Sequence, residues 1–130
     1  MKKVIFACVH NAGRSQMAAA FFNQLTQPSR ARALSAGTRP GERVHPEVVE
    51  VMKEVGIDLS TEKPQLLTEE LAKDADVLIT MGCGDECPYV PGLERRDWPL
   101  ADPKGKDIVE VRRIRDEIRD RVSKLSASLT

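Results

Sequence analysis

Residues 3–15 read KVIFACVHNAGRS, and this stretch decides the fold class. Its first part, residues 3–7, is a short and nearly continuous apolar run, which is typical of a parallel strand buried on both faces. Residues 15–27 carry apolar side chains at helical spacing, and Pro28 ends that pattern. The stretch therefore predicts a buried strand, a loop over residues 8–15 and a helix, which together form the first half of a βαβ unit.

Strands and helices continue to alternate along the rest of the chain. The same patterns predict, in order, a strand over residues 31–36, a helix over 46–55, a short helix over 68–73, a strand over 76–81 and a helix over 107–126. Residues 83–100 are rich in Gly and Pro and predict a loop, with a short strand near Trp98. The alternation predicts one α/β domain over residues 1–130, with a parallel sheet covered by helices on both faces.

Composition and charge exclude several classes of protein. Lys and Arg total 20 and Asp and Glu total 20, so a net charge of zero offers no positive patch to nucleic acid or an anionic membrane. The longest apolar run, residues 4–9, is too short to span a bilayer, and no signal-peptide cleavage site follows it. Three cysteines, an odd number, favour reactive thiols over a disulfide-stapled secreted fold. We therefore expect a cytoplasmic monomer without nucleic-acid or membrane partners.

The loop over residues 8–15 has the pattern Cys, five residues, Arg, Ser. A loop wound around a tetrahedral oxyanion points its backbone N–H groups inward, and the following helix adds the positive end of its dipole. Arg14 can bind two oxygens with its planar fork, and the same groups stabilise a thiolate, so Cys8 is expected to be the nucleophile. Ser15 can donate a hydrogen bond to that thiolate. The residues expected to bind the oxyanion are Val9, His10, Asn11, Ala12, Gly13, Arg14 and Ser15.

Residues 8–18, CVHNAGRSQMA, resemble the active-site loop of the thioredoxin-coupled arsenate reductases, which share a fold with the low-molecular-weight protein tyrosine phosphatases. The resemblance extends over nearly the whole chain and includes residues 35–38, residues 81–92, Asp97 and Trp98, Asp102 and Pro103, and residues 114–118. It implies a four-stranded parallel sheet in the order 2-1-3-4. It also implies that the protein reduces arsenate to arsenite, with phosphate or sulfate as competing oxyanions.

Three features favour a reductase over a phosphatase. Ser15 is followed by Gln-Met-Ala, as in the arsenate reductases, where the phosphatases have Pro. Pro103 is followed by Lys-Gly instead of the tyrosines that would stack on an aromatic substrate. Cys83 and Cys87 lie in the predicted loop after the third strand, where a phosphatase has no use for them. Two thiols that end as a disulfide supply the two electrons that arsenate reduction needs.

The resemblance also implies a mechanism. The Cys8 thiolate attacks arsenate, and Asp102 protonates the leaving oxygen as general acid. Cys83 and Cys87 then release arsenite and end as a disulfide, which a thioredoxin-like protein reduces. Three residues separate these two cysteines, where better-known members have six. Chains with the shorter spacing resemble relatives that pass the arsenate to a low-molecular-weight thiol such as mycothiol, with a glutaredoxin- or mycoredoxin-like partner.

Three alternatives stay open at this point. One is an arsenate–mycothiol transferase that uses only Cys8, one is a low-molecular-weight protein tyrosine phosphatase, and one is a non-catalytic anion-binding or redox-sensing module. No cofactor is expected. Some members bind potassium through a Glu eleven residues after the nucleophile, and because that position is Ala19 here, we expect no metal site of that composition.

Other polar residues near these motifs are expected to be structural. The side chain of His10 should point away from the loop centre, and His45 should lie at the surface or cap a helix. Ser35 and Gly37 should support the loop. Asp97 and Trp98 are assigned to packing.

Overall fold

The computed structural model describes residues 1–82 and 92–129. Its elements, in chain order, are β1 (Lys2–Cys8), α1 (Arg14–Leu25), β2 (Ala31–Gly37), α2 (Pro46–Lys53), α3 (Glu69–Ala72), β3 (Val77–Thr80), β4 (Glu94–Asp97) and α4 (Ile108–Leu129). Every helix and strand predicted from periodicity or apolar runs is present, with bounds that differ by a few residues at most. None of the described helices combines the length and apolar character that a membrane crossing requires.

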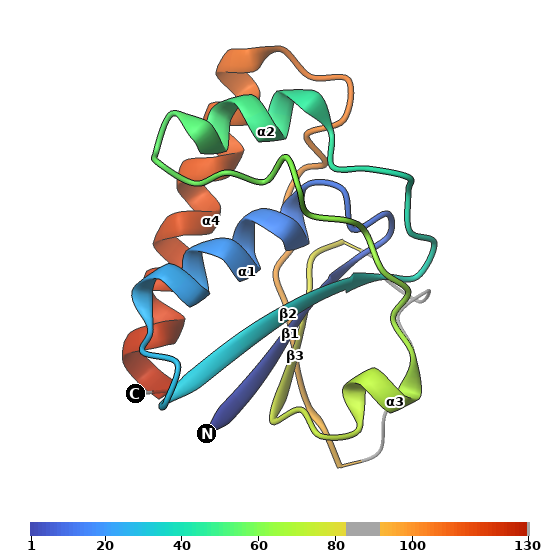
Figure 1. Ribbon diagram of the computed structural model, residues 1–130, viewed down its shortest axis with the longest axis vertical. Helices are drawn as coiled ribbons and strands as arrows, with labels where there is room; N and C mark the ends of the chain where they lie inside the picture. The colour runs from blue at the N-terminus through green and yellow to red at the C-terminus, as the bar shows by residue number, and fades with distance from the viewer. Residues whose placement is uncertain (83–91, 130) are drawn as a thin grey trace.

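The four strands form one parallel sheet in the order β2-β1-β3-β4, which confirms the order implied by the resemblance (Figure 1). β1 lies inside the sheet, and its last residue, Cys8, pairs with Gly37 at the end of β2. Because the strands are parallel, their carboxyl ends meet at one edge, which also holds Thr80 and Asp97. Ligands of open α/β sheets bind at this edge, so the fold places Cys8 where a binding site is expected.

Helices cover both faces of the sheet (Figure 1). On the face covered by α1, α2 and α4, Phe6 of β1 joins a large apolar cluster with Phe22 and Ile118. On the face with α3, Ile5 of β1 joins a smaller cluster with Ala72. Successive residues of β1 face opposite sides, and both sides are buried. This explains why the strand is a continuous apolar run instead of an alternating one.

β4 is the strand with the weakest signal in its own residues. Glu94–Asp97 reads ERRD, and all four residues are exposed. The strand pairs with β3, and the next residue, Trp98, donates its N–H to the carbonyl oxygen of Thr80 at 2.7 Å. The Trp98 ring packs against Phe6, with ring centroids 5.7 Å apart. The expectation of a short strand near Trp98, and of a packing role for this side chain, is therefore confirmed.

Replacing Ile118 by Ala tests the packing of α4 on the sheet. Ile118 is fully buried, and its truncation should lower the free energy of unfolding by about 2–5 kcal/mol, because the lost burial adds to the cavity left behind. Val109 lies on the same helix but is 68% exposed, so Val109→Ala is the matched control and should cost less than about 0.5 kcal/mol. Urea denaturation followed by circular dichroism measures both, and equal losses would contradict the packing described here.

Candidate active site

The loop over residues 9–13 joins β1 to α1 and is held from its outer side. Its backbone carbonyls and that of Cys8 accept backbone hydrogen bonds of 2.8–3.3 Å from the segment after β2: Thr38 to Cys8, Arg39 to Val9, Gly41 to His10 and His45 to Ala12. The carbonyl of Asn11 accepts one from the side chain of Gln16. In a trans peptide the carbonyl and the following N–H point in opposite directions. The N–H groups of residues 9–13 therefore point into the loop, as binding of a tetrahedral oxyanion requires.

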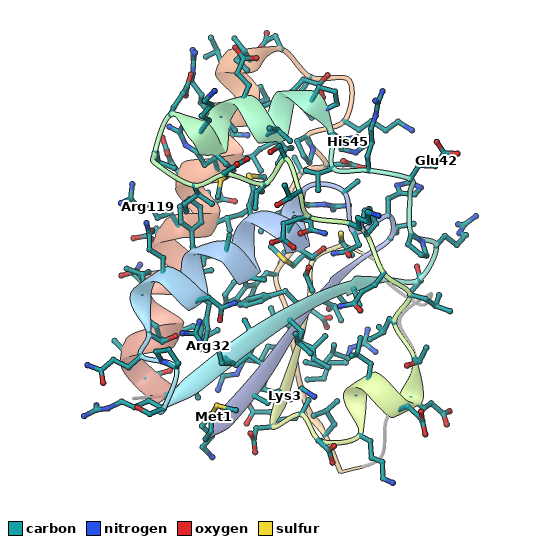
Figure 2. The ribbon with its side chains drawn as sticks, in the orientation of Figure 1. Met1, Lys3, Arg32, Glu42, His45 and Arg119 are labelled. Atoms are coloured by element: carbon teal, nitrogen blue, oxygen red, sulfur yellow. The ribbon has the colours of Figure 1, made fainter. Side chains whose placement is uncertain are left out.

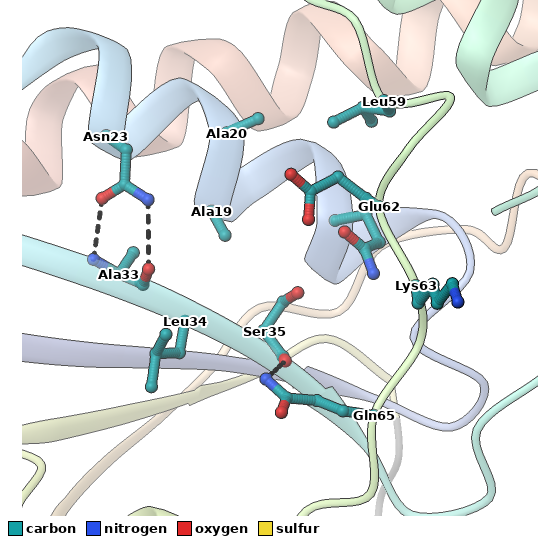
Figure 3. A pocket seen from close by; sticks show the side chains of 11 residues that line it. Ala19, Ala20, Asn23, Ala33, Leu34, Ser35, Leu59, Glu62, Lys63 and Gln65 are labelled. Carbon is teal, nitrogen blue, oxygen red and sulfur yellow. Dashed lines mark hydrogen bonds between the residues drawn. The ribbon is translucent and has the colours of Figure 1, made fainter. Parts of the chain in front are cut away.

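Gly37 allows the end of β2 to approach this loop closely. A Cβ atom at Gly37 would lie 2.6 Å from the carbonyl oxygen of Val9 and 2.9 Å from the backbone nitrogen of Asn11. A larger residue would push the loop away, so Gly37 supports it, as expected. Ser35 does not contact the loop in this way. It lines a separate pocket of about 240 Å³ beside α1, where its carbonyl accepts a hydrogen bond from Gln65 (Figure 3).

The thiol of Cys8 lies beside two polar side chains of the loop. Cys8 is 2% exposed, and its Sγ atom is 2.9 Å from the hydroxyl oxygen of Ser15. That oxygen accepts a hydrogen bond from the side-chain amide of Asn11 at 2.7 Å. Because the amide nitrogen can only donate, the hydroxyl proton of Ser15 is left for the sulfur of Cys8.

The orientation of the Asn11 side chain follows from its other partners. Its Oδ1 atom accepts hydrogen bonds from the backbone N–H of Gln65 at 3.0 Å and from Nε2 of Gln16 at 3.2 Å. A backbone N–H can only donate, so the oxygen must face Gln65 and the NH₂ group must face Ser15. Asn11 has φ 51°, and among the described residues other than glycine it alone has a positive φ. Asn adopts this left-handed conformation more readily than most residues.

Arg14 closes the loop at the first residue of α1. Its side chain is buried, Nη1 donates to the carbonyl oxygen of Leu100 at 3.0 Å, and Nη2 lies 3.7 Å from Oδ2 of Asp102. Gly82, shortly after β3, makes room for the guanidinium, because a Cβ atom there would collide with Nη1. Sequence reasoning missed Gly82 and Leu100, since their contacts join segments far apart in the chain. The one local signal for Gly82 was that a glycine directly follows a predicted strand.

Asp102 reaches the loop because the next residue packs on it. A Cβ atom at Gly13 would lie 2.8 Å from Cγ of Pro103, so the absence of a side chain at Gly13 seats the proline against the loop. Gly13 itself has φ −146° and ψ −89°, and its close contact with Pro103 is one that the sequence did not predict. The side chain of Asp102 is 44% exposed, and Oδ1 accepts the backbone N–H of Lys104 at 3.0 Å.

The two histidines lie outside the loop centre. His10 lines an open cavity together with His45 and Lys104. His45 occupies the N-cap position of α2, as expected, where its backbone carbonyl accepts hydrogen bonds from Val48 and Val49, but its side chain makes no capping hydrogen bond. Partial burial lowers the pKa of His45, and the carboxylate of Asp102 offsets part of this shift. Cys83 and Cys87 lie outside the described residues, so the structure does not place the predicted redox pair.

This arrangement defines a class of α/β proteins. A loop of inward-pointing N–H groups begins at a buried cysteine, ends at an arginine on the first turn of a helix and lies at the carboxyl edge of a parallel sheet. Such a loop combines a binding site for an oxyanion with a thiol at the start of the same loop.

Comparison with known proteins assigns the family. A family model described as low molecular weight phosphotyrosine protein phosphatase matches residues 3–130. A relative named glutaredoxin arsenate reductase, from Synechocystis sp., is 37% identical over 133 residues, which cover 100% of each chain. The chain therefore belongs to the low molecular weight phosphotyrosine protein phosphatase family, in the branch that holds arsenate reductases.

Solved structures of relatives have the same fold. A thioredoxin-dependent arsenate reductase from Corynebacterium glutamicum is 40% identical with a TM-score of 0.85; the match covers 99% of this chain and 62% of that one. A second structure, described as an arsenate reductase in the phosphate binding state, is 35% identical with a TM-score of 0.85 and is matched over 100% of both chains. The family resemblance drawn from the sequence is thus confirmed.

Asn11→Asp tests the hydrogen-bond chain that ends at Cys8. A carboxylate cannot donate to Ser15, so the serine hydroxyl should turn toward it and leave Cys8 without a donor. We expect alkylation of Cys8 by iodoacetamide at pH 7 to slow by about tenfold, the effect of one hydrogen bond to a charged group. Asn23→Asp is the control, because the side chain of Asn23 bonds the backbone of Ala33, away from the thiol (Figure 3). Unchanged alkylation in Asn11→Asp would refute the assigned donor.

Gly82→Ala tests the space that Arg14 occupies. Gly82 has φ +99°, and its Cβ would collide with the guanidinium, so the substitution should weaken binding of inorganic phosphate by about tenfold or more as well as destabilise the fold. Gly56 has φ +83° with nothing near its Cβ position. Gly56→Ala should therefore lose a similar roughly 1–2 kcal/mol of stability and keep phosphate binding. Titration calorimetry and urea denaturation separate the two effects, and equal phosphate affinities would refute the role of Gly82.

Proposed function

We propose that the protein is an arsenate reductase with Cys8 as its nucleophile. The observation that carries this proposal is the Cys8 thiol, 2.9 Å from the Ser15 hydroxyl, at the start of a loop with inward N–H groups. Arsenate and phosphate are tetrahedral oxyanions of the same charge, and a relative's structure is described as a phosphate-binding state of an arsenate reductase. Phosphate and sulfate should accordingly compete with arsenate at this loop.

The first half of the reaction uses the described residues. The Cys8 thiolate attacks arsenic while the N–H groups of the loop and Arg14 hold the oxygens. The carboxyl of Asp102 gives its proton to the oxygen that leaves, so that water departs and a Cys8–arsenic(V) bond remains. The 3.7 Å between Arg14 Nη2 and Asp102 Oδ2 supports this assignment, since an oxyanion held by the guanidinium would lie within reach of the acid.

The second half needs two electrons, which we assign to Cys83 and Cys87. Attack of the Cys83 thiolate on the sulfur of Cys8 breaks the sulfur–arsenic bond, and the electron pair stays on arsenic as arsenite. Cys87 then attacks Cys83, frees Cys8 and leaves a Cys83–Cys87 disulfide. The chain enters the segment with these cysteines at Gly82, which lies against Arg14, and this supports the relay.

A thiol-dependent protein must restore the dithiol. Relatives carry the names of a thioredoxin-dependent and of a glutaredoxin arsenate reductase, so the reductant belongs to one of these two classes. The second candidate mechanism, transfer of the arsenate to mycothiol or a similar thiol from Cys8 alone, is favoured by the short spacing of Cys83 and Cys87. Both mechanisms fit a protein of the cytoplasm, where free thiols persist.

A single-turnover experiment tests the activity and the electron source together. Fully reduced protein, mixed with arsenate in the absence of other thiols, should release about one arsenite per chain and stop, because one dithiol holds two electrons. Mass spectrometry should find a disulfide between Cys83 and Cys87. Cys83→Ser should block release, whereas Cys87→Ser should release arsenite once and stall with Cys8 joined to Cys83.

Cys8→Ser is the control for the whole reaction, since a serine hydroxyl stays un-ionised at neutral pH. Arsenite release within tenfold of the unmodified protein in Cys8→Ser would exclude Cys8 as the nucleophile. Normal turnover of Cys83→Ser and Cys87→Ser with a low-molecular-weight thiol would exclude the relay and leave the transferase mechanism. Absence of arsenite under every thiol condition would exclude arsenate reduction itself.

A further inference from the structure

An open cavity of about 600 Å³ lies beside the loop that joins β1 to α1. Two residues of this loop line it, and so does the segment over residues 41–45; Figure 2 labels Glu42 and His45 on this segment. Lys104 also lines the cavity, and its backbone N–H donates to Oδ1 of Asp102 at 3.0 Å. The cavity therefore borders both the loop and the segment that carries the acid.

The charges that line this cavity do not cancel. Arg43 and Lys104 carry two positive charges, and Glu42 is the one acidic side chain among the lining residues. Within the described part of the chain, neither cation forms an ion pair with an acidic side chain. Burial is the main cause that lowers the pKa of His45, so its imidazole adds no charge at pH 7. One uncompensated positive charge therefore remains beside the loop.

This excess is local. The whole chain has 20 basic and 20 acidic side chains, so its net charge attracts no anion from a distance. Inside the loop, Nη2 of Arg14 lies 3.7 Å from Oδ2 of Asp102. Two opposite charges this close act on a distant ion mainly as a dipole, because their separate Coulomb energies nearly cancel there. Arg43 and Lys104 have no such partner, and they are the cations that an approaching anion would meet with their charge undiminished.

We propose that Arg43 and Lys104 form an electrostatic entrance that draws doubly charged oxyanions into the loop over Cys8. This inference rests on the proposed function only in taking the loop as the oxyanion site. Cations beside a cleft raise the local concentration and the association rate of an anion, and salt weakens this effect. Arg43 and Lys104 thus act on the approach of the substrate, whereas Arg14 and the N–H groups of the loop hold it after arrival.

Two alkylating reagents that differ in charge test the proposal without arsenate. Iodoacetate and iodoacetamide react with a thiolate by the same displacement, but only iodoacetate carries a negative charge. The ratio of their rates at Cys8, followed by mass spectrometry of the peptide with Cys8, therefore reports the electrostatic potential at the loop. A variant that merely disturbs the fold or the thiol would change both rates and leave their ratio unchanged.

The variants should move this ratio in opposite directions. At an ionic strength of about 0.01 M, Arg43→Gln and Lys104→Gln should each lower the ratio of iodoacetate to iodoacetamide rates about twofold. Glu42→Gln should raise it by about the same factor, because it removes the opposing charge. At about 1 M salt, where the screening length is about 3 Å, the ratios of all variants should converge.

Lys2→Gln is the matched control for the loss of one positive charge. Lys2 begins β1 and Cys8 ends it, so the two residues are about 20 Å apart along the strand. At this distance the substitution should change the ratio by less than about 1.3-fold. Because arsenate carries two charges, its kcat/KM at low salt should fall about threefold in Arg43→Gln and in Lys104→Gln.

The outcomes separate this proposal from the proposed function. Ratios that Arg43→Gln, Lys104→Gln and Glu42→Gln leave unchanged, or change equally at low and high salt, would overturn the entrance. If arsenite forms normally alongside such ratios, the proposed function stands without it. A protein that forms no arsenite but shows the expected salt-dependent ratios would overturn the proposed function and support the entrance.

Discussion

The side-chain amide of Asn11 is the constraint on which the site depends. Asn11 is fully buried in a left-handed backbone conformation, and its side chain joins its own loop to the first turn of α1, through Ser15 and Gln16, and to the segment at Gln65. A buried amide group left without a partner costs about 1–3 kcal/mol, so the three segments keep one arrangement. Because the Gln65 segment is itself bonded to Gly37 at the end of β2, the sheet edge and the Cys8 thiol are held in one network.

The fold could be predicted where its causes are local. β1 and β3 are apolar runs buried on both faces, and α4 carries a continuous apolar stripe, so composition and spacing suffice for them. β4 is different, because its four residues are charged and exposed, with neither an apolar run nor an apolar–polar alternation. It exists because β3 offers it a pairing edge and because Trp98 packs on Phe6, and both causes come from distant parts of the chain.

The same distinction holds at the site. Cys8, Asn11 and Arg14 stand within one loop, and their spacing alone indicates an oxyanion site. Gly82 contacts Arg14, and Pro103 contacts Gly13. The two residues of each pair lie far apart in the sequence. No periodicity predicts such contacts, because they depend on how closely two backbones approach after folding. For Gly13 the loop spacing indicates the residue, but the room that it leaves for Pro103 depends on the folded chain.

The loop itself does not decide between redox and hydrolytic chemistry. A loop of this kind can bind a tetrahedral oxyanion beside a thiolate, and both reactions begin with the attack of such a thiolate on the central atom. The two reactions differ in the step that follows this attack. A second thiol attacks the sulfur of Cys8 and leaves an electron pair on the central atom, which arsenic(V) accepts readily and phosphorus(V) does not. Water instead attacks the central atom and leaves the electron pair on sulfur, which is the course of hydrolysis when the central atom is phosphorus. The nucleophile that reaches the intermediate, a second thiol or a water molecule, therefore determines whether the electron pair of the bond between sulfur and the central atom stays on that atom or returns to sulfur.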